Sequence, residues 1–195
     1  MSQSTAAEAA AILELAKEKG ALQFGEFRLS SGERSSYYFD GRLVTLDPQG
    51  AHLVTAALLP LVHECGAEAI AGPAVAAVPM VAAITLSSQE HGRPVPGLIV
   101  RAQAKGHGAG RLIEGPLIAG SRVAVVDDTC STGASLFHAI NALEAQQCRI
   151  VKVMCILDRR QGGSDELRSR GYDFMALLEA DEQGEVIPAA TGGGR

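Results

Sequence analysis

The sequence has neither an excess of basic residues nor a long apolar run, and these two absences exclude whole classes of function. Its 195 residues carry a formal net charge of −5, and no cluster of lysine and arginine offers the positive surface that nucleic acid requires. No apolar stretch approaches the roughly 20 residues that cross a bilayer, and the first residues lack the charged and apolar segments of a signal peptide. We therefore expect a cytoplasmic protein that binds neither nucleic acid nor membrane.

Several common metal and phosphate motifs are missing as well. The four cysteines, Cys65, Cys130, Cys148 and Cys155, form no C-x-x-C pair and do not stand at zinc spacing from a histidine. We expect them to be reduced and to pack as small apolar residues. The sequence contains no G-x-x-x-x-G-K-[ST] motif, and no G-x-G-x-x-G follows an expected strand, which excludes a P-loop and a dinucleotide fingerprint.

The composition that is present, with 47% apolar and 20% charged residues, is typical of a globular domain, and the length fits one domain. Strand-like and helix-like segments alternate, which predicts an α/β fold with a mainly parallel central sheet flanked by helices. The expected strands are 68–72, 97–101, 123–126, 150–157 and 172–178. The expected helices are 6–19, 48–64, 79–89, 134–143 and 164–170. Ligands of such sheets bind at the carboxyl ends of the strands.

The whole chain, 1–195, is expected to form a single domain with three parts. Residues 1–45 or so supply an amino-terminal helix and two strand-like segments, 24–30 and 37–40, which predict an antiparallel flap. The α/β core covers about 46–180, and the glycine-rich tail, about 190–195, is expected to be disordered.

Residues 122–135 form the most informative stretch of the sequence. A buried strand, Val123–Val126, ends in Asp127 and Asp128, and the small residues 129–133 then lead into a helix. Free N–H groups at a helix start bind phosphate, and the two carboxylates can accept hydrogen bonds from a vicinal diol or hold a water on Mg²⁺. An ordinary solvated turn followed by a helix cap remains the alternative.

Four segments together resemble a known enzyme family. Residues 122–135 resemble the PRPP-binding motif of type I phosphoribosyltransferases. Residues 24–42 match F-G-x-F-x-L-x-S-G-x-x-S-x-x-Y-x-D-x-R, which is similar to the amino-terminal signature of the orotate phosphoribosyltransferases. The segment 100–115 resembles the catalytic loop of that family, and 157–162 resembles its pyrimidine-side loop. The resemblance extends from about residue 21 to residue 178.

The resemblance implies a type I phosphoribosyltransferase fold with an amino-terminal hood. It also implies Mg²⁺-dependent transfer of the 5-phosphoribosyl group from PRPP to orotate, which yields orotidine 5′-monophosphate and pyrophosphate in pyrimidine synthesis. In the family, the loop that corresponds to 102–113 reaches into the site of the neighbouring subunit, so a homodimer is implied. Two alternatives stay open, namely a phosphoribosyltransferase for another base and a PRPP-binding regulator without turnover.

The resemblance also assigns roles to individual residues. The catalytic residues are implied to be Arg101, Lys105, His107, Asp127 and Asp128. PRPP is implied to contact these five and Thr129, Cys130, Ser131, Thr132, Gly133, Ala134 and Ser135. Orotate is implied to contact Tyr37, Tyr38, Thr129 and Arg159. Mg²⁺ is expected to be held mainly by PRPP, with a water-mediated contact to Asp127 or Asp128.

The basic residues of the loop suit the chemistry of a departing diphosphate. Arg101, Lys105 and His107 can meet the negative charge that develops on the leaving group, and a glycine-rich loop can fold over the site and exclude water. The alternatives are a surface histidine and an Arg101–Glu114 ion pair.

Three positions depart from the more basic family members, which carry lysine where this chain has Ser30, Ala76 and Ala102. Fewer cations are then expected to face the diphosphate, although backbone N–H groups of residues 74–78 can still bind it.

Overall fold

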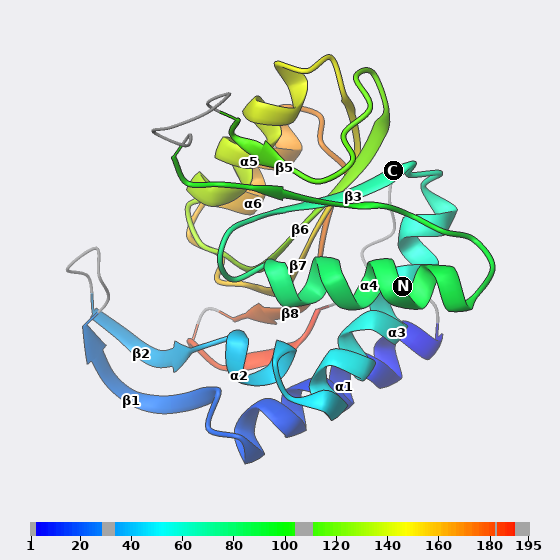
Figure 1. Cartoon of the computed structure of the whole chain (residues 1–195). Coiled ribbons are helices and arrows are strands. Elements are labelled where there is room, and N and C mark those ends of the chain that lie inside the picture. The colour runs from blue at the N-terminus through cyan, green and yellow to red at the C-terminus, as the bar shows by residue number, and fades with distance from the viewer. Residues whose placement is uncertain (1–2, 29–33, 104–110, 182, 190–195) are drawn as a thin grey trace.

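The structure, a computed structural model, describes residues 3–28, 34–103, 111–181 and 183–189 (Figure 1). The helices of this part of the chain are α1 (Gln3–Glu18), α2 (Arg42–Thr45), α3 (Pro48–Glu64), α4 (Val78–Glu90), α5 (Ala134–Glu144) and α6 (Gly163–Ser169). The strands are β1 (Leu22–Arg28), β2 (Arg34–Phe39), β3 (Ala69–Pro73), β4 (Gly97–Val100), β5 (Ile113–Glu114), β6 (Arg122–Cys130), β7 (Arg149–Asp158), β8 (Phe174–Ala180) and β9 (Val186–Pro188). The predicted tail, 190–195, lies outside the described residues.

A seven-stranded sheet with the order β5-β4-β3-β6-β7-β8-β9 forms the centre of the molecule. Neighbours among β4, β3, β6, β7 and β8 pair in parallel, which confirms the predicted parallel sheet. The edge strands β5 and β9 pair antiparallel with β4 and β8. The sequence did not predict them, because two or three residues are too few to show a strand periodicity.

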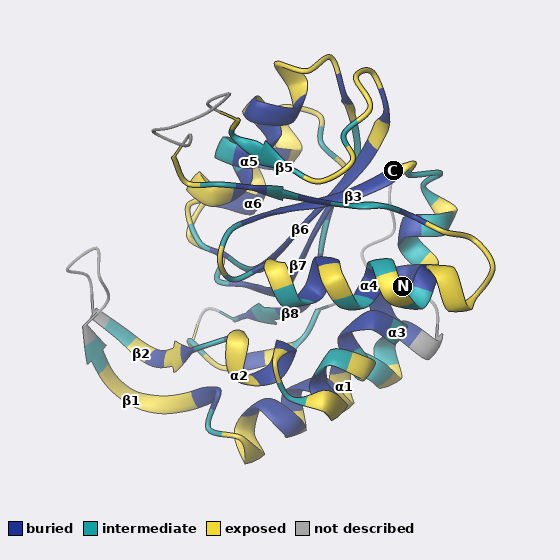
Figure 2. Cartoon of the chain, viewed as in Figure 1, coloured by how far each residue is buried: buried dark blue, intermediate teal, exposed yellow. Residues whose placement is uncertain are grey.

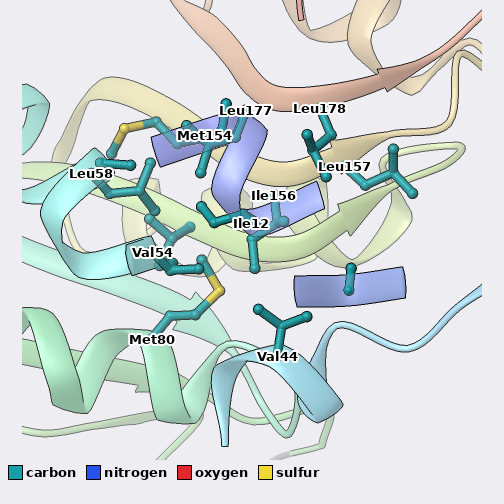
Figure 3. Packing of buried hydrophobic residues seen from close by; sticks show 14 of the residues in the cluster. Ile12, Val44, Val54, Leu58, Met80, Met154, Ile156, Leu157, Leu177 and Leu178 are labelled. Carbon is teal, nitrogen blue, oxygen red and sulfur yellow. The ribbon is translucent and has the colours of Figure 1, made fainter. Parts of the chain in front are cut away.

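Helices cover both faces of the sheet (Figure 1). The helices α5 and α6 lie on one face, and α1, α3 and α4 lie on the other, with the short α2 beside them. Figure 2 shows that the central strands are largely buried. In Figure 3, Ile12 of α1, Leu58 of α3 and Met80 of α4 pack near Ile156 of β7. Burial of such side chains contributes about 1.5–3 kcal/mol each, so this core fixes the positions of the strand ends.

Helix α3 begins at the residue that the sequence predicted. The Asp47 carboxylate caps it by accepting hydrogen bonds from the backbone N–H groups of Gln49 and Gly50 at 2.9 and 3.1 Å, and Pro48 fits the first helical position. Helix α1 begins at Gln3, three residues before the predicted start, and ends at Glu18.

Strands β1 and β2 form a separate two-stranded antiparallel sheet, as predicted for the flap (Figure 1). Because side chains alternate along a strand, Tyr37 and Phe39 of β2 point into the core and are buried, whereas Tyr38 is 38% exposed. The flap thus presents Tyr37 and Tyr38 to different surroundings.

The order of the strands reverses at β3 and β6, and this reversal positions the site. The chain leaves β3 through α4 to reach β4 on one side, then returns to β6 on the other side. Ligands of open α/β sheets bind at such a switch point, outside the carboxyl ends of the strands. A Cβ on Gly72 of β3 would lie 2.6 Å from the Val126 carbonyl oxygen and 2.4 Å from the Ala77 Cβ, so glycine permits the close approach of the loop after β3 to β6.

Candidate active site

The two carboxylates lie within β6. The sequence placed the end of this strand at Val126, but β6 continues to Cys130, because Thr129 and Cys130 pair with Leu157 and Asp158 of β7. Successive residues of a strand point to opposite faces, so Asp127 and Asp128 diverge.

Asp127 points toward α5, and Asp128 points toward the end of the flap. The Ser135 hydroxyl donates to Asp127 Oδ2 at 2.6 Å, and the backbone N–H of Asp128 donates to Asp127 Oδ1 at 2.9 Å. On the other face, a Cβ on Gly41 would lie 2.6 Å from the Asp128 Cβ. The pair therefore connects the helix that opens the phosphate loop to the flap.

Both acids are held in surroundings that disfavour their charged form. Burial, followed by the charge of Asp128, raises the pKa of Asp127 to about 7, although the Ser135 hydroxyl opposes the shift. Burial also raises the pKa of Asp128, and the Thr129 hydroxyl, which donates to it at 3.2 Å, opposes that shift. Among the described residues, no lysine, arginine or histidine forms a salt bridge with either acid. Ligand hydroxyl groups are donors that would stabilise them.

The turn between β6 and α5 is short and consists of residues 131–133. Gly133 adopts a left-handed conformation, with φ of 77°, and in the described part of the chain no side chain caps the start of α5. The first backbone N–H groups of a helix have no partner within the helix, and together with the helix dipole they form an anion site. The predicted phosphate loop thus has the expected geometry at its helix end.

Gly163, at the start of α6, supports this turn from the side. Its backbone N–H donates to the Ser131 carbonyl at 2.9 Å. A Cβ at this position would lie 2.4 Å from the Gly133 nitrogen and 2.6 Å from the Ser131 oxygen. Sequence analysis missed Gly163, and the one available signal was its place in the Gly162-Gly163 pair.

Arg159 and Tyr37 come together at the other end of the site, as their predicted roles require. The Arg159 guanidinium carbon lies 4.8 Å from the centroid of the Tyr37 ring, and its Nη2 donates to the Ser35 hydroxyl at 3.2 Å. Burial raises the pKa of Tyr37, against the effect of the nearby Arg159 charge. The Tyr38 ring instead lies 5.8 Å from the ring of Phe27.

Arg101 stands at the base of the predicted catalytic loop. Its Nη1 lies 3.5 Å from Glu114 Oε1, its backbone N–H donates to the Leu112 carbonyl at 2.9 Å, and its carbonyl accepts from His138 Nε2 at 2.9 Å. His138, on α5, was not predicted. The base of the loop is thereby attached to the helix that begins at the phosphate turn.

Part of the predicted loop lies outside the described residues. Lys105 and His107 lie outside the described residues, as does Ser30. Ala102 is exposed and Ala76 half-buried, so neither small side chain fills the core.

Comparisons with known proteins decide the family. The model of the family described as "Phosphoribosyl transferase domain" matches residues 65–188. The orotate phosphoribosyltransferase of Nostoc sp. is 42% identical over 155 residues, which cover 79% of this chain and 75% of that protein. The chain belongs to the orotate phosphoribosyltransferases.

Other members of the orotate phosphoribosyltransferases agree in sequence and fold. The enzyme of Thermococcus gammatolerans is 36% identical over 167 residues, covering 85% of this chain and 86% of that protein. The crystal structure of the Mycobacterium tuberculosis enzyme in complex with PRPP has a TM-score of 0.72 at 28% identity and covers 88% of this chain and 96% of that chain. The type I phosphoribosyltransferase fold expected from the sequence is confirmed.

A cavity of about 510 Å³ lies away from the strand ends of this orotate phosphoribosyltransferase. It is bordered by α1, α3, α4 and the segment after α4, and its lining includes His52, His63 and His91. None of its lining residues is a predicted site residue. The two acids, the start of α5 and Arg159 lie instead at the carboxyl ends of β6 and β7.

None of the helices in the described part of the chain is both long enough and apolar enough to span a membrane.

Proposed function

We propose that the protein transfers the 5-phosphoribosyl group of PRPP to orotate. In this reaction the bond from the ribose anomeric carbon to the diphosphate breaks, and its electron pair leaves with the diphosphate. A bond to the ring nitrogen of orotate forms, and that nitrogen loses its proton. One observation carries the proposal. An uncapped helix start, the buried Asp127 with the half-buried Asp128, and an arginine stacked on a tyrosine lie next to one another.

The geometry supports a distinct task for each part of the site. Backbone N–H groups of residues 131–135 suit the 5′-phosphate, and Asp127 and Asp128 suit the hydroxyl groups of the ribose. The contribution of Cys130 is limited to its backbone, because its side chain is buried and its carbonyl accepts from the Arg159 N–H at 2.8 Å. That hydrogen bond joins the loop proposed for the sugar to the arginine proposed for the base, which supports the proposal.

The departing diphosphate is met by Arg101, Lys105 and His107 in this proposal. Positive charge develops on the sugar and negative charge on the leaving group, so cations near the diphosphate stabilise the transition state. The Arg101 side chain lies near Glu114, and its planar fork suits diphosphate oxygens.

Mg²⁺ is proposed to enter with PRPP. The described residues contain no group of three or more histidine, cysteine, aspartate or glutamate side chains that could hold a metal ion. Oxygen ligands of the diphosphate suit Mg²⁺, which usually keeps several waters, and Asp127 or Asp128 would hold one of them. The ion would neutralise charge on the diphosphate.

We further propose a homodimer in which loop 102–113 reaches the neighbouring site. Exposed apolar side chains support an interface at α2 and α4, both of which carry exposed positions (Figure 2). They are Leu43 and Leu46 at α2, Val75 shortly before α4, Val78 at the start of α4, and Leu86 farther along α4. Exposed apolar patches of this kind commonly mark protein contacts.

Hybrid dimers test this arrangement. Inactive Lys105→Ala chains are mixed with inactive chains that carry Asp127→Asn and Asp128→Asn, and activity is measured after subunits have exchanged. Recovered activity is expected, because one site of each hybrid has an intact loop and intact acids. Hybrids without activity would show that the loop acts in its own subunit.

The cytoplasm is the proposed location. The four cysteines are free thiols, which suits a reducing compartment.

The reaction itself is tested by mixing the protein with PRPP, Mg²⁺ and orotate and following the loss of orotate absorbance. Turnover with orotate, and none when uracil or adenine replaces it, is the expected result. Turnover with another base alone would favour the second transferase, and PRPP binding without any turnover would favour a regulator.

A further inference from the structure

The hydroxyl of Ser35, on β2, occupies a position where all its hydrogen-bonding capacity is used. A serine hydroxyl has one donor and two acceptor lone pairs. The Ser35 hydroxyl donates to the Tyr37 carbonyl at 2.6 Å and accepts from the Tyr37 N–H at 3.3 Å. Its remaining lone pair accepts from Arg159 Nη2 at 3.2 Å. The direction of each bond is fixed, because the carbonyl can only accept and the two N–H groups can only donate.

These contacts hold the Arg159 guanidinium from two sides. The Tyr37 ring covers one face of it at 4.8 Å, and Ser35 binds one of its terminal nitrogens. Arg159 Nε is buried and has no hydrogen-bond partner among the described residues. Because Nε is buried, an acceptor-rich ligand would meet the terminal nitrogens, of which Ser35 binds Nη2. An arginine side chain loses considerable rotamer freedom when it is ordered, and Ser35 and Tyr37 order it before the ligand binds.

We propose that Ser35 is a positioning residue that sets where Arg159 meets the pyrimidine and thereby determines the affinity for orotate. This inference rests on the proposed function. It concerns a residue outside the predicted site, contributed by the flap and acting through a side chain 124 positions later in the sequence. Ser36, the next residue, is exposed and has no contact with Arg159 among the hydrogen bonds described, so it serves as the matched control.

The test compares Ser35→Ala with Ser36→Ala in steady-state kinetics. Loss of a hydrogen bond to a charged group corresponds to about 10-fold or more in binding, so Ser35→Ala is expected to raise KM for orotate about 10-fold. We expect its KM for PRPP and its kcat to stay within about 2-fold of wild type, and its Tm within about 2 °C, since the phosphate turn and the core are untouched. Ser36→Ala is expected to match wild type throughout. Ser35→Thr, which restores a hydroxyl on a strand, is expected to recover most of the affinity.

A double-mutant cycle separates positioning from a direct contact. If Ser35 acts through Arg159, adding Ser35→Ala to Arg159→Ala changes KM for orotate no further. Any of three outcomes would overturn the inference. The first is that the two substitutions raise KM for orotate additively, and the second is that Ser35→Ala leaves KM for orotate unchanged. The third is that Ser35→Ala raises KM for orotate and KM for PRPP equally and lowers Tm. Wild-type protein that fails to turn over orotate would instead overturn the proposed function, and the inference with it.

Discussion

The phosphate end of the site consists of backbone groups, whereas the base end consists of side chains. At the phosphate end, residues 131–133 offer backbone groups, and Gly163 approaches them so closely that a single Cβ would overlap their atoms. At the base end, side chains form the contacts, since Arg159 of the loop after β7 binds Ser35 and stacks on Tyr37 of the flap. One end is fixed by the parallel sheet, and the other depends on the separate two-stranded flap, whose Ser35 and Tyr37 contact Arg159.

This difference indicates how each end tolerates change. Backbone groups cannot be replaced by substitution, so the phosphate end is sensitive to added volume and insensitive to side-chain chemistry. The base end relies on the geometry of a hydrogen bond and a ring contact between side chains. Sugar-phosphate binding and choice of base can therefore vary separately, and substitutions at the two ends are expected to change different kinetic constants.

The largest effect is expected from Gly163→Ala at the phosphate end. The new Cβ would displace the phosphate turn, and a displacement of about 1 Å can cost about 100-fold in rate. We expect kcat/KM for PRPP to fall at least about 100-fold. Kinetics at varied PRPP concentration, together with Tm, provide the measurement.

The neighbouring glycine supplies the control for this substitution. Gly162 has φ of 92°, and a Cβ there would meet no atom within 4 Å. Gly162→Ala is expected to cost about 1 kcal/mol of stability through backbone strain and to leave KM for PRPP near wild type. An unchanged KM for PRPP in Gly163→Ala would contradict the claim that the turn has no spare volume.

The second-largest effect is expected from Asp127→Asn, which should lower the activity and raise the stability of the protein. Loss of a charged acceptor for the ribose hydroxyls corresponds to about 10- to 100-fold in kcat/KM. In the folded protein the pKa of Asp127 is raised from 3.8 to about 7, so the protonated form stabilises the fold. That stabilisation is full below pH 3.8 and is lost as the pH rises through about 7. Above pH 7 the ionised carboxylate thus costs up to about 4 kcal/mol.

Asp127→Asn is therefore expected to raise the unfolding free energy of the ligand-free protein at pH 8, with a gain that shrinks toward pH 5. Urea unfolding at several pH values measures it. Asp165→Asn on α6, where the carboxylate is exposed, serves as the control and should show no such trend. A gain that did not depend on pH would exclude the ionisation of Asp127 as its cause.

The sequence was sufficient for the parallel sheet, for α3 and for the strand–turn–helix unit, because each has a local pattern. It was insufficient where contacts decide the structure. Thr129 and Cys130 have the composition of a loop, yet pairing with β7 extends β6 through them. Ser35 and Gly163 contact partners that are distant in sequence. Ser35 is a position of the amino-terminal signature and Gly163 stands in a glycine pair, but neither pattern identifies the partner. The predicted roles of Lys105 and His107 remain predictions.

A smaller and more selective effect is expected from Arg159→Lys at the base end. Lysine keeps the charge but loses the planar fork that stacks on Tyr37 and donates to Ser35. We expect KM for orotate to rise about 10-fold, as for the loss of one charged hydrogen bond, and KM for PRPP to stay near wild type. Arg160→Lys is the control, because that neighbouring arginine pairs with Glu179 at 3.0 Å instead. A matching rise in KM for PRPP would show that the two ends do not vary separately.

The smallest effect is expected at Cys130, inside the phosphate end. Its side chain is 1% exposed, and burial, with the charges of Asp158 and Asp127, raises the pKa of its thiol to about 12. At neutral pH the thiol is protonated and inaccessible, so iodoacetamide should not inactivate the enzyme through this residue. Cys130→Ala is expected to change KM for PRPP less than about 2-fold while costing about 1 kcal/mol of packing. Inactivation by iodoacetamide that PRPP prevents and Cys130→Ala abolishes would place the thiol in the site, contrary to a phosphate end made of backbone.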